Sequence, residues 1–161
     1  ISAYFSLVLM SISLAACASI QMSHQQQLIA QCKQQKGAMV SELTCPTSKE
    51  KRQGQFCIVP KKTSEFVFFN GCTAGIADYD AVFFDECLTH DMCYHHEPVT
   101  NGKSKSQCDT NFYESMKLKC DRREDKKRCL VMAKLFYEGV EHFGDKSWQC
   151  SDLVNDDLLQ D

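Results

Sequence analysis

The most informative stretch of this sequence reads Cys87-Leu88-Thr89-His90-Asp91-Met92-Cys93-Tyr94. Its first cysteine, its histidine, its aspartate and its tyrosine stand at positions i, i+3, i+4 and i+7, which share one face of an α-helix. Asp80 is suited to cap this helix, which we expect to run to about His96. The spacing therefore predicts a helix that presents an imidazole, a carboxylate and a phenol on the same side.

A second helix is expected after a short connection. Ser104 and Gln107 have the spacing of a capping box, which opens a helix that should reach about Cys120. Helices joined by a short connection pack as antiparallel neighbours. Asp109, early in the second helix, would then lie within reach of His90 in the first.

An apolar run and a glycine-containing loop precede the first helix. The run is Phe66-Val67-Phe68-Phe69, and the loop is Asn70-Gly71-Cys72-Thr73-Ala74-Gly75. Glycine tolerates backbone conformations that turn carbonyl groups toward a common point. Calcium accepts such carbonyls as readily as carboxylates, so the loop and Asp91 would together make a calcium site. The phenylalanines suit either a lipid-facing rim or the core, and both interpretations stay open.

These groups match the needs of ester hydrolysis without a covalent intermediate. That reaction requires a base that takes a proton from water and a positive centre that stabilises the developing oxyanion. His90 would be the base, because a carboxylate such as Asp109 holds one tautomer and stabilises the imidazolium. Tyr94, one turn beyond His90, would hydrogen-bond the same carboxylate.

The motif Cys-x-x-His-Asp-x-Cys-Tyr at 87–94 resembles the active-site helix of secreted phospholipases A2. Cys72 lies eighteen residues before His90, close to the spacing of the loop cysteine in that family. The similarity spans about Phe66 to Cys120. It implies a mainly α, disulfide-rich small domain with two antiparallel active-site helices and a calcium-binding loop. It also implies calcium-dependent hydrolysis of the sn-2 ester of glycerophospholipids in membranes or micelles, with a fatty acid and a lysophospholipid as products.

The resemblance assigns roles to single residues. It makes His90 the general base, with Asp109 and Tyr94 as its catalytic partners. Calcium would be bound by Asp91 and by three loop carbonyls, those of Gly71, Thr73 and Gly75. Two disulfides carry over, Cys72 with Cys87 and Cys93 with Cys108.

The sequence also departs from the common enzymes of that family. Glu86 precedes Cys87 where those enzymes have a second cysteine, and Ser115 stands where its partner is expected. The connection between the two helices is also too short for their β-hairpin. In these respects the chain is more similar to compact relatives such as the conodipines of cone snail venom, whose precursor is cut into two disulfide-linked chains. The basic residues near Arg123 and Arg128 would be the cleavage sites, unless they form a plain solvated linker.

Composition and cysteine usage limit the class of protein. The 161 residues fit one small domain, and the net charge of −3 without a basic stripe argues against nucleic-acid binding. Residues 1–18 are uncharged and end in small residues, which predicts a secretory signal peptide; a buried helix or a lipoprotein signal ending at Cys17 are the alternatives. Ten of the eleven cysteines then remain, so we expect five disulfides and a secreted, extracellular protein.

Four segments follow from this reading. Residues 1–18 are the signal peptide, and 19–65 form a disulfide-stapled, mostly irregular arm with a helix over Ser23 to Lys36. Residues 66–121 hold the calcium loop and the catalytic helix pair. Residues 122–161 hold a basic linker and a C-terminal helical segment closed by Gly144. The pairing of the six other cysteines stays open among fifteen schemes.

Two further functions remain open at this stage. One is a secreted toxin or receptor-binding protein that uses the same scaffold without catalysis. The other is a crosslinked structural module of an extracellular matrix. A zinc site at His95 and His96 is disfavoured, because an oxidised Cys93 cannot act as a thiolate ligand.

Overall fold

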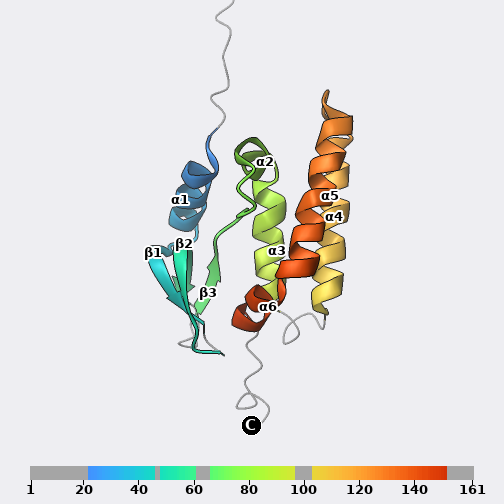
Figure 1. Cartoon of the computed structure of the whole chain (residues 1–161). Coiled ribbons are helices and arrows are strands. Elements are labelled where there is room, and N and C mark those ends of the chain that lie inside the picture. The colour runs from blue at the N-terminus through green and yellow to red at the C-terminus, as the bar shows by residue number, and fades with distance from the viewer. Residues whose placement is uncertain (1–21, 46–47, 61–65, 97–102, 152–161) are drawn as a thin grey trace, which may run out of the picture.

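The computed structural model describes residues 22–45, 48–60, 66–96 and 103–151 (Figure 1). The elements follow the chain in the order α1 (His24–Gln34), β1 (Ala38–Thr44), β2 (Lys51–Pro60), β3 (Phe66–Phe69), α2 (Ala77–Val82), α3 (Phe84–His96), α4 (Lys105–Cys120), α5 (Lys126–Phe143) and α6 (Asp145–Ser151). The mainly α, disulfide-rich class is confirmed. Within the described ranges, none of the helices combines the length and the apolar character that crossing a bilayer requires. The predicted signal peptide lies outside these ranges.

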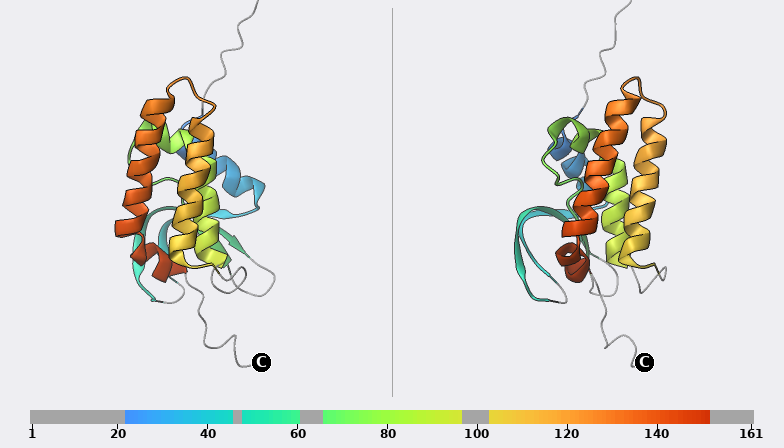
Figure 2. Two further views of the ribbon diagram at one scale, coloured as in Figure 1. Left: turned by 90° about the vertical axis from the view of Figure 1, so that its right-hand side faces the viewer. Right: turned by 45° about the vertical axis from the view of Figure 1, so that its right-hand side comes forward.

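Three long helices form the larger part of the molecule. α3, α4 and α5 lie side by side and alternate in direction along the chain (Figures 1 and 2). Their shared core includes Phe83, Phe112, Met116, Ala133 and Phe136. Packing in this core determines how far α4 is shifted along its axis relative to α3. This shift decides which side chains of the two helices meet.

The start of α4 is confirmed where the capping box predicts it. Ser104 Oγ accepts a hydrogen bond from the backbone amide of Gln107, whose side chain accepts one from the backbone amide of Ser104. The box satisfies two amide groups that would otherwise lack partners at a helix end. The box therefore fixes the first turn of α4. Asp109 comes directly after this turn.

The single helix predicted from Asp80 to His96 is wrong, because the structure has two helices there. Asp80 lies inside α2, and the chain breaks at Phe83 before α3 begins. The break places two adjacent aromatic rings in different parts of the core. Phe83 packs edge-on against Phe136 of α5, whereas Phe84 packs against His24 of α1.

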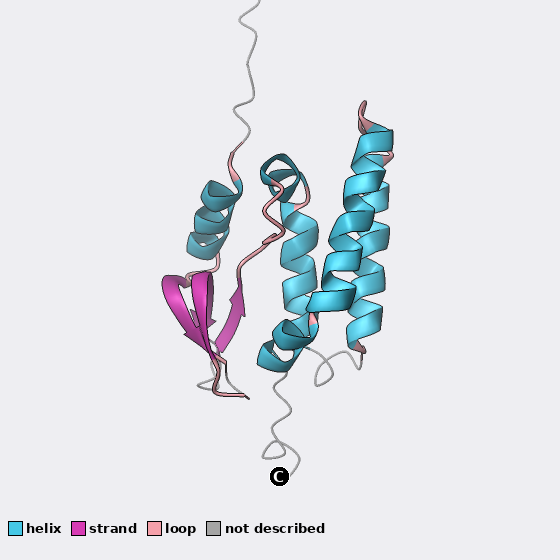
Figure 3. Ribbon diagram, in the orientation of Figure 1, coloured by secondary structure: helices cyan, strands magenta, loops and turns pink. Residues whose placement is uncertain are grey.

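The prediction of a mostly irregular arm is also wrong. α1 begins after Ser23 as expected, but the chain then forms an antiparallel sheet of order β1-β2-β3. The run Phe66–Phe69 is its third strand, and its partners on β2 extend from Pro60, opposite Phe66, to Cys57, opposite Phe69. Figure 3 shows this sheet on one side of the molecule, opposite the long helices, with α6 between them at one end.

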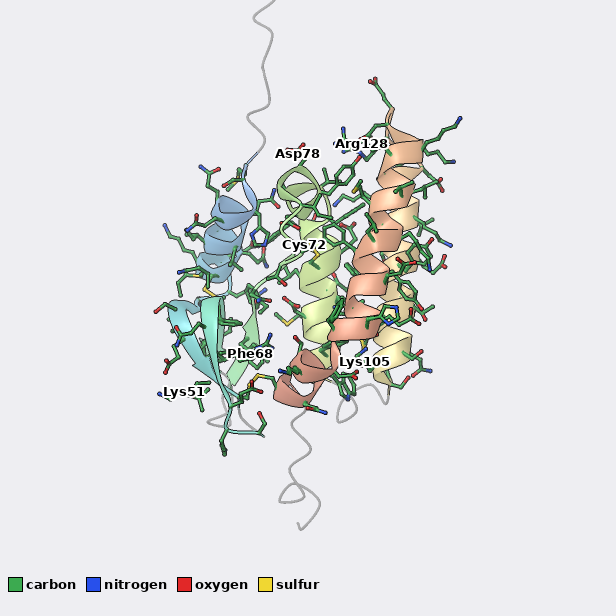
Figure 4. The ribbon with its side chains drawn as sticks, viewed as in Figure 1. Lys51, Phe68, Cys72, Asp78, Lys105 and Arg128 are labelled. Carbon is green, nitrogen blue, oxygen red and sulfur yellow. A yellow bond between two sulfur atoms is a disulfide. The ribbon has the colours of Figure 1, made fainter. Side chains whose placement is uncertain are left out.

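Five disulfides connect these elements, and their sulfur atoms are visible in Figure 4. The pairs are Cys32–Cys57, Cys45–Cys150, Cys72–Cys87, Cys93–Cys108 and Cys120–Cys129. Both pairs that the resemblance implies are present. Cys45–Cys150 has the largest sequence separation, 105 residues, and ties the end of β1 to α6.

The predicted basic linker is shorter than expected. α4 ends at Cys120 and α5 begins at Lys126, so Lys126-Lys127-Arg128 belongs to the first turn of a helix. Asp125 accepts hydrogen bonds from Arg123 and from the hydroxyl of Tyr79, which bind the turn to α2. The turn is tied to the fold through Asp125, while the side chains of Arg122, Lys126, Lys127 and Arg128 are exposed, as the alternative of a solvated linker expects.

Candidate functional site

His90 and Asp109 face each other between α3 and α4. His90 Nε2 lies 2.7 Å from Asp109 Oδ1, and the hydroxyl of Tyr94 donates to the same oxygen at 2.6 Å. His90 is 7% exposed, and Asp109 and Tyr94 are each 3% exposed. The rings of Tyr94 and Phe112 lie 4.2 and 4.7 Å from the imidazole, measured between centroids. Because Nε2 faces the carboxylate, Nδ1 is the ring nitrogen left to take up a proton.

Lys105 is a member of this cluster that the sequence reasoning missed. Its Nζ lies 3.0 Å from Asp109 Oδ2 and donates to the carbonyl oxygen of Val140, near the end of α5, at 3.0 Å. Burial alone would raise the pKa of Asp109, but hydrogen bonds from His90, Tyr94 and Lys105 outweigh it and hold that pKa below its usual value. Asp109 therefore stays ionised behind the imidazole. Lys105 and Asp109 are separated by four positions in a helix, and this spacing could have predicted their ion pair from the sequence.

Gly144, at the junction of α5 and α6, packs against the same cluster. A Cβ atom there would lie 2.7 Å from Tyr94 Oη and 3.2 Å from Lys105 Cε. The junction therefore has no room for a side chain. Lys105 lies at the lower end of α4 in Figure 4, next to the last turn of α5.

Asp91 lies beside the glycine loop, as the sequence predicts. Its Oδ2 accepts hydrogen bonds from the backbone amides of Asn70 and Gly71 at 3.0 and 2.8 Å. Gly71 has φ 67°, a conformation that favours glycine, and a Cβ atom there would lie 2.9 Å from His24 Nε2. Glycine at this position therefore lets the loop reach the carboxylate.

Burial disfavours the charged form of Asp91. Burial raises the pKa of Asp91 to about 6, although His90, the two loop amides and Arg52 act in the opposite direction. A cation bound at this carboxylate would offset the penalty. Within the described ranges no three His, Cys, Asp or Glu side chains converge on one point, so such a cation would need backbone carbonyls as ligands. In the loop, Gly71 is buried next to Asp91, whereas Thr73 and Gly75 are exposed.

A pocket of 470 Å³ opens over the imidazole and this carboxylate. The residues that line it include His90, Asp91, Gly71 and Thr73, while Gly75 is not among them. Most of its walls are apolar, contributed by Phe56, Phe68, Phe69, Ile76, Phe112, Leu135, Phe136, Val140 and Phe143. The volume and character are those of a small-molecule or acyl-chain site.

The sequence left open whether the phenylalanines of the 66–69 run belong to the core or to a lipid-facing rim. Phe68 and Phe69 are buried, so the core interpretation holds for them, and both also form part of the pocket wall. The large apolar side chains at the pocket that are exposed are Phe143, 82% exposed, and Leu135, 47% exposed, both from α5. The side chain of Phe66 lies outside the described residues, so the question stays open for it.

No family model, curated protein or solved structure matches this chain. Functional roles must therefore be argued from the arrangement of its own residues. The structure brings His90, Tyr94 and Asp109 together in one cluster, with Asp91 and the start of the loop at the same pocket. Gly75, predicted as a metal ligand, stands at the far end of the loop. Cys93 is bonded to Cys108, so it is not a thiolate ligand for zinc.

Proposed function

We propose that this chain is a secreted, calcium-dependent hydrolase of the phospholipase A2 type. The observation that carries the proposal is the buried contact of His90 with Asp109 at an apolar pocket that also exposes Asp91. A general base held by an ionised acid is what water activation requires. The substrate class, the sn-2 ester of glycerophospholipids, follows from the resemblance of the 87–94 motif and from the apolar pocket walls.

His90 would act through Nδ1. It removes a proton from water as that water attacks the ester carbonyl, and the imidazolium formed is stabilised by Asp109 through Nε2. Tyr94 and Lys105 keep Asp109 in place during this change of charge. The imidazolium then returns its proton to the leaving glycerol oxygen.

Asp91, with the loop carbonyls of Gly71 and Thr73, would hold the calcium ion. Bound calcium supplies a positive centre that polarises the ester carbonyl. The apolar walls would receive the acyl chain and exclude water around it. Gly75 is the weakest member of the proposed ligand set, because it does not line the pocket.

The decisive experiment measures fatty-acid release from mixed phospholipid vesicles labelled in the sn-2 chain. We expect release by the wild-type chain with calcium, and a loss of release with a chelator or in His90→Gln. The matched control is His142→Gln, which removes an exposed histidine of α5 and should act as wild type. Release that survives both the chelator and His90→Gln would refute the proposal. A biological effect that persists in an inactive His90→Gln would instead favour the toxin or receptor-binding alternative.

A two-chain mature form is part of the proposal. Cleavage near Arg123 or Arg128 falls between Cys120 and Cys129, and the disulfide that joins them would keep the two pieces connected. Mass spectrometry of the secreted protein before and after reduction tests this. One chain after reduction would exclude cleavage, and a mature N-terminus other than Ser19 would place the signal cleavage elsewhere.

A further inference from the structure

Arg52 of β2 belongs to the wall of the candidate pocket. The pocket that holds His90 and Asp91 is lined by Arg52, which also lines a second hollow beside α1. Its side chain is half-buried, and its Nη1 donates a hydrogen bond to Ser147 Oγ of α6 at 3.0 Å. The guanidinium is therefore held over the pocket from both the sheet and the C-terminal helix.

The positive charge of Arg52 has no acidic partner in the part of the chain that the structure describes. Its neighbour Lys51 points elsewhere and pairs with Glu42 at 3.0 Å. A guanidinium carries five N–H donors in a planar fork, of which the bond to Ser147 uses one. A half-buried cation with free donors at a pocket wall is suited to bind an anion in the pocket.

Arg52 and Asp91 line the same pocket, so a cation and a carboxylate border one cavity. The pocket thus combines a carboxylate beside the base, a guanidinium on another wall and apolar surface between them. A phospholipid has matching parts: an ester, a phosphodiester whose negative charge is shared by two oxygens, and an acyl chain.

We propose that Arg52 binds the phosphate group of a phospholipid in this pocket and so orients the ester toward His90. The orienting role rests on the proposed hydrolase function, whereas the phosphate contact itself does not. Arg52 is in this view a specificity-determining residue. An enzyme of this kind would prefer esters that carry a phosphate near the scissile bond over neutral esters of equal length.

The competing explanation is that Arg52 only ties β2 to α6. Two variants separate these roles. Ser147→Ala removes the hydrogen bond to α6 and leaves the cation, whereas Arg52→Met removes both. A purely structural Arg52 predicts equal losses in the two variants, while a phosphate-binding Arg52 predicts a large loss only in Arg52→Met.

The experiment is a binding titration that needs no turnover. The probe is dodecylphosphocholine below its critical micelle concentration, in the presence of a chelator, because it has a phosphate and one chain but no ester. Trp148 is the single tryptophan of the chain, follows Ser147 directly and stacks edge-on against Tyr94 at 5.2 Å, so its fluorescence reports on occupancy. We expect Arg52→Met to weaken binding by about 10- to 100-fold, the usual effect of losing a hydrogen-bonded charge.

Controls define what would overturn the inference. Lys51→Met makes the same charge change one residue away and should bind as wild type. Ser147→Ala loosens Arg52 but leaves its charge, so it should weaken binding by no more than about threefold. A neutral amphiphile, octaethylene glycol dodecyl ether, should bind Arg52→Met and wild type alike. Equal binding of dodecylphosphocholine by Arg52→Met and wild type overturns the proposal, as do equal losses with both amphiphiles. Inorganic phosphate that binds as tightly as dodecylphosphocholine would show a site for free phosphate instead of lipid.

The outcome is independent of the hydrolase assay. Binding that depends on Arg52 in a chain that hydrolyses nothing would refute only the hydrolase proposal. If the chain hydrolyses phospholipid but Arg52→Met binds the phosphate probe as well as wild type, only this inference is refuted. Circular dichroism and thermal unfolding of each variant show whether it has folded, and Arg52→Lys keeps the charge should Arg52→Met fail to fold.

Discussion

Lys105 Nζ lies 3.0 Å from Asp109 Oδ2 and forms a second hydrogen bond to the carbonyl oxygen of Val140. One ammonium group thus neutralises the acid behind His90 and binds the start of α4 to the end of α5. Asp109 is almost fully buried, so its charge has few other sources of compensation. The acid and the packing of α5 are consequently linked through one side chain.

Replacement of Lys105 by Met should therefore affect both stability and proton transfer. We expect the free energy of unfolding to fall by about 2 kcal/mol, because a buried carboxylate loses a charged partner. We also expect kcat to fall, since Asp109 loses one of the hydrogen bonds that hold its pKa below the usual value and keep it ionised. Lys146→Met, an exposed lysine of α6, is the control. An unchanged kcat in a destabilised Lys105→Met would reduce Lys105 to a packing role.

The contact between His90 and Asp109 leads to a separate prediction. Asp109→Asn should lower kcat by about two to four orders of magnitude, because the amide no longer stabilises the imidazolium. Tyr94→Phe keeps the acid and should cost less than about tenfold in kcat, with about 1 kcal/mol in stability. Steady-state kinetics on sn-2-labelled vesicles give both numbers. Similar kcat losses in the two variants would mean that Asp109 has no special role.

Asp91 predicts a pH-dependent difference in stability in the metal-free protein. Folding raises its pKa to about 6, so the native state binds more protons than the unfolded state between about pH 4 and 6. Its contribution to stability therefore decreases as pH rises through that window. In a chelator, Asp91→Asn should be more stable than wild type at pH 7, and this gain should vanish near pH 4. Thermal unfolding across pH is the measurement.

Thermal unfolding in the presence of calcium tests the same carboxylate in the opposite way. A cation at Asp91 favours the ionised carboxylate, so calcium should raise the unfolding temperature of the wild type at pH 7 and less so at pH 5. Asp91→Asn should show no calcium effect. Equal stabilisation of both proteins would place the calcium site elsewhere.

The disulfides differ in the stability they are expected to contribute. The loss of Cys45–Cys150, through serine at both positions, should lower the free energy of unfolding by about 5 kcal/mol, because the bond closes a long loop. The loss of Cys120–Cys129, with a separation of 9 residues, should lower it by about 3 kcal/mol. Denaturant titrations of the two double variants compare them directly. A larger loss for Cys120–Cys129 would contradict the loop-length argument.

The sequence was most predictive where local patterns determine local structure. The capping box of Ser104 and Gln107 placed the start of α4, and helical spacing put His90 and Tyr94 on one face. The contact with Asp109 then followed from the short connection between the helices. Each of these inferences spans only a few turns of helix.

The missed features depend on partners far away in the chain. Arg52 meets Ser147 across 95 residues, and Lys105 meets Val140 across 35. β1 is largely exposed and mixes apolar with polar residues without a regular alternation, so its sequence does not indicate a strand until β2 is known to pair with it. The break at Phe83 likewise depends on separate contacts of two aromatic rings with α1 and α5. Tertiary packing, and not local preference, decides these positions.

The bond between Cys45 and Cys150 has a consequence for where the pocket can exist. It joins the sheet that carries Arg52 to the helix that carries Ser147, so a covalent link connects two walls of the pocket in addition to their hydrogen bond. Thiols in a reducing cytosol do not sustain such a link. A newly made chain would therefore lack this link until it meets an oxidant, and the proposed hydrolase would acquire it only after leaving the reducing compartment.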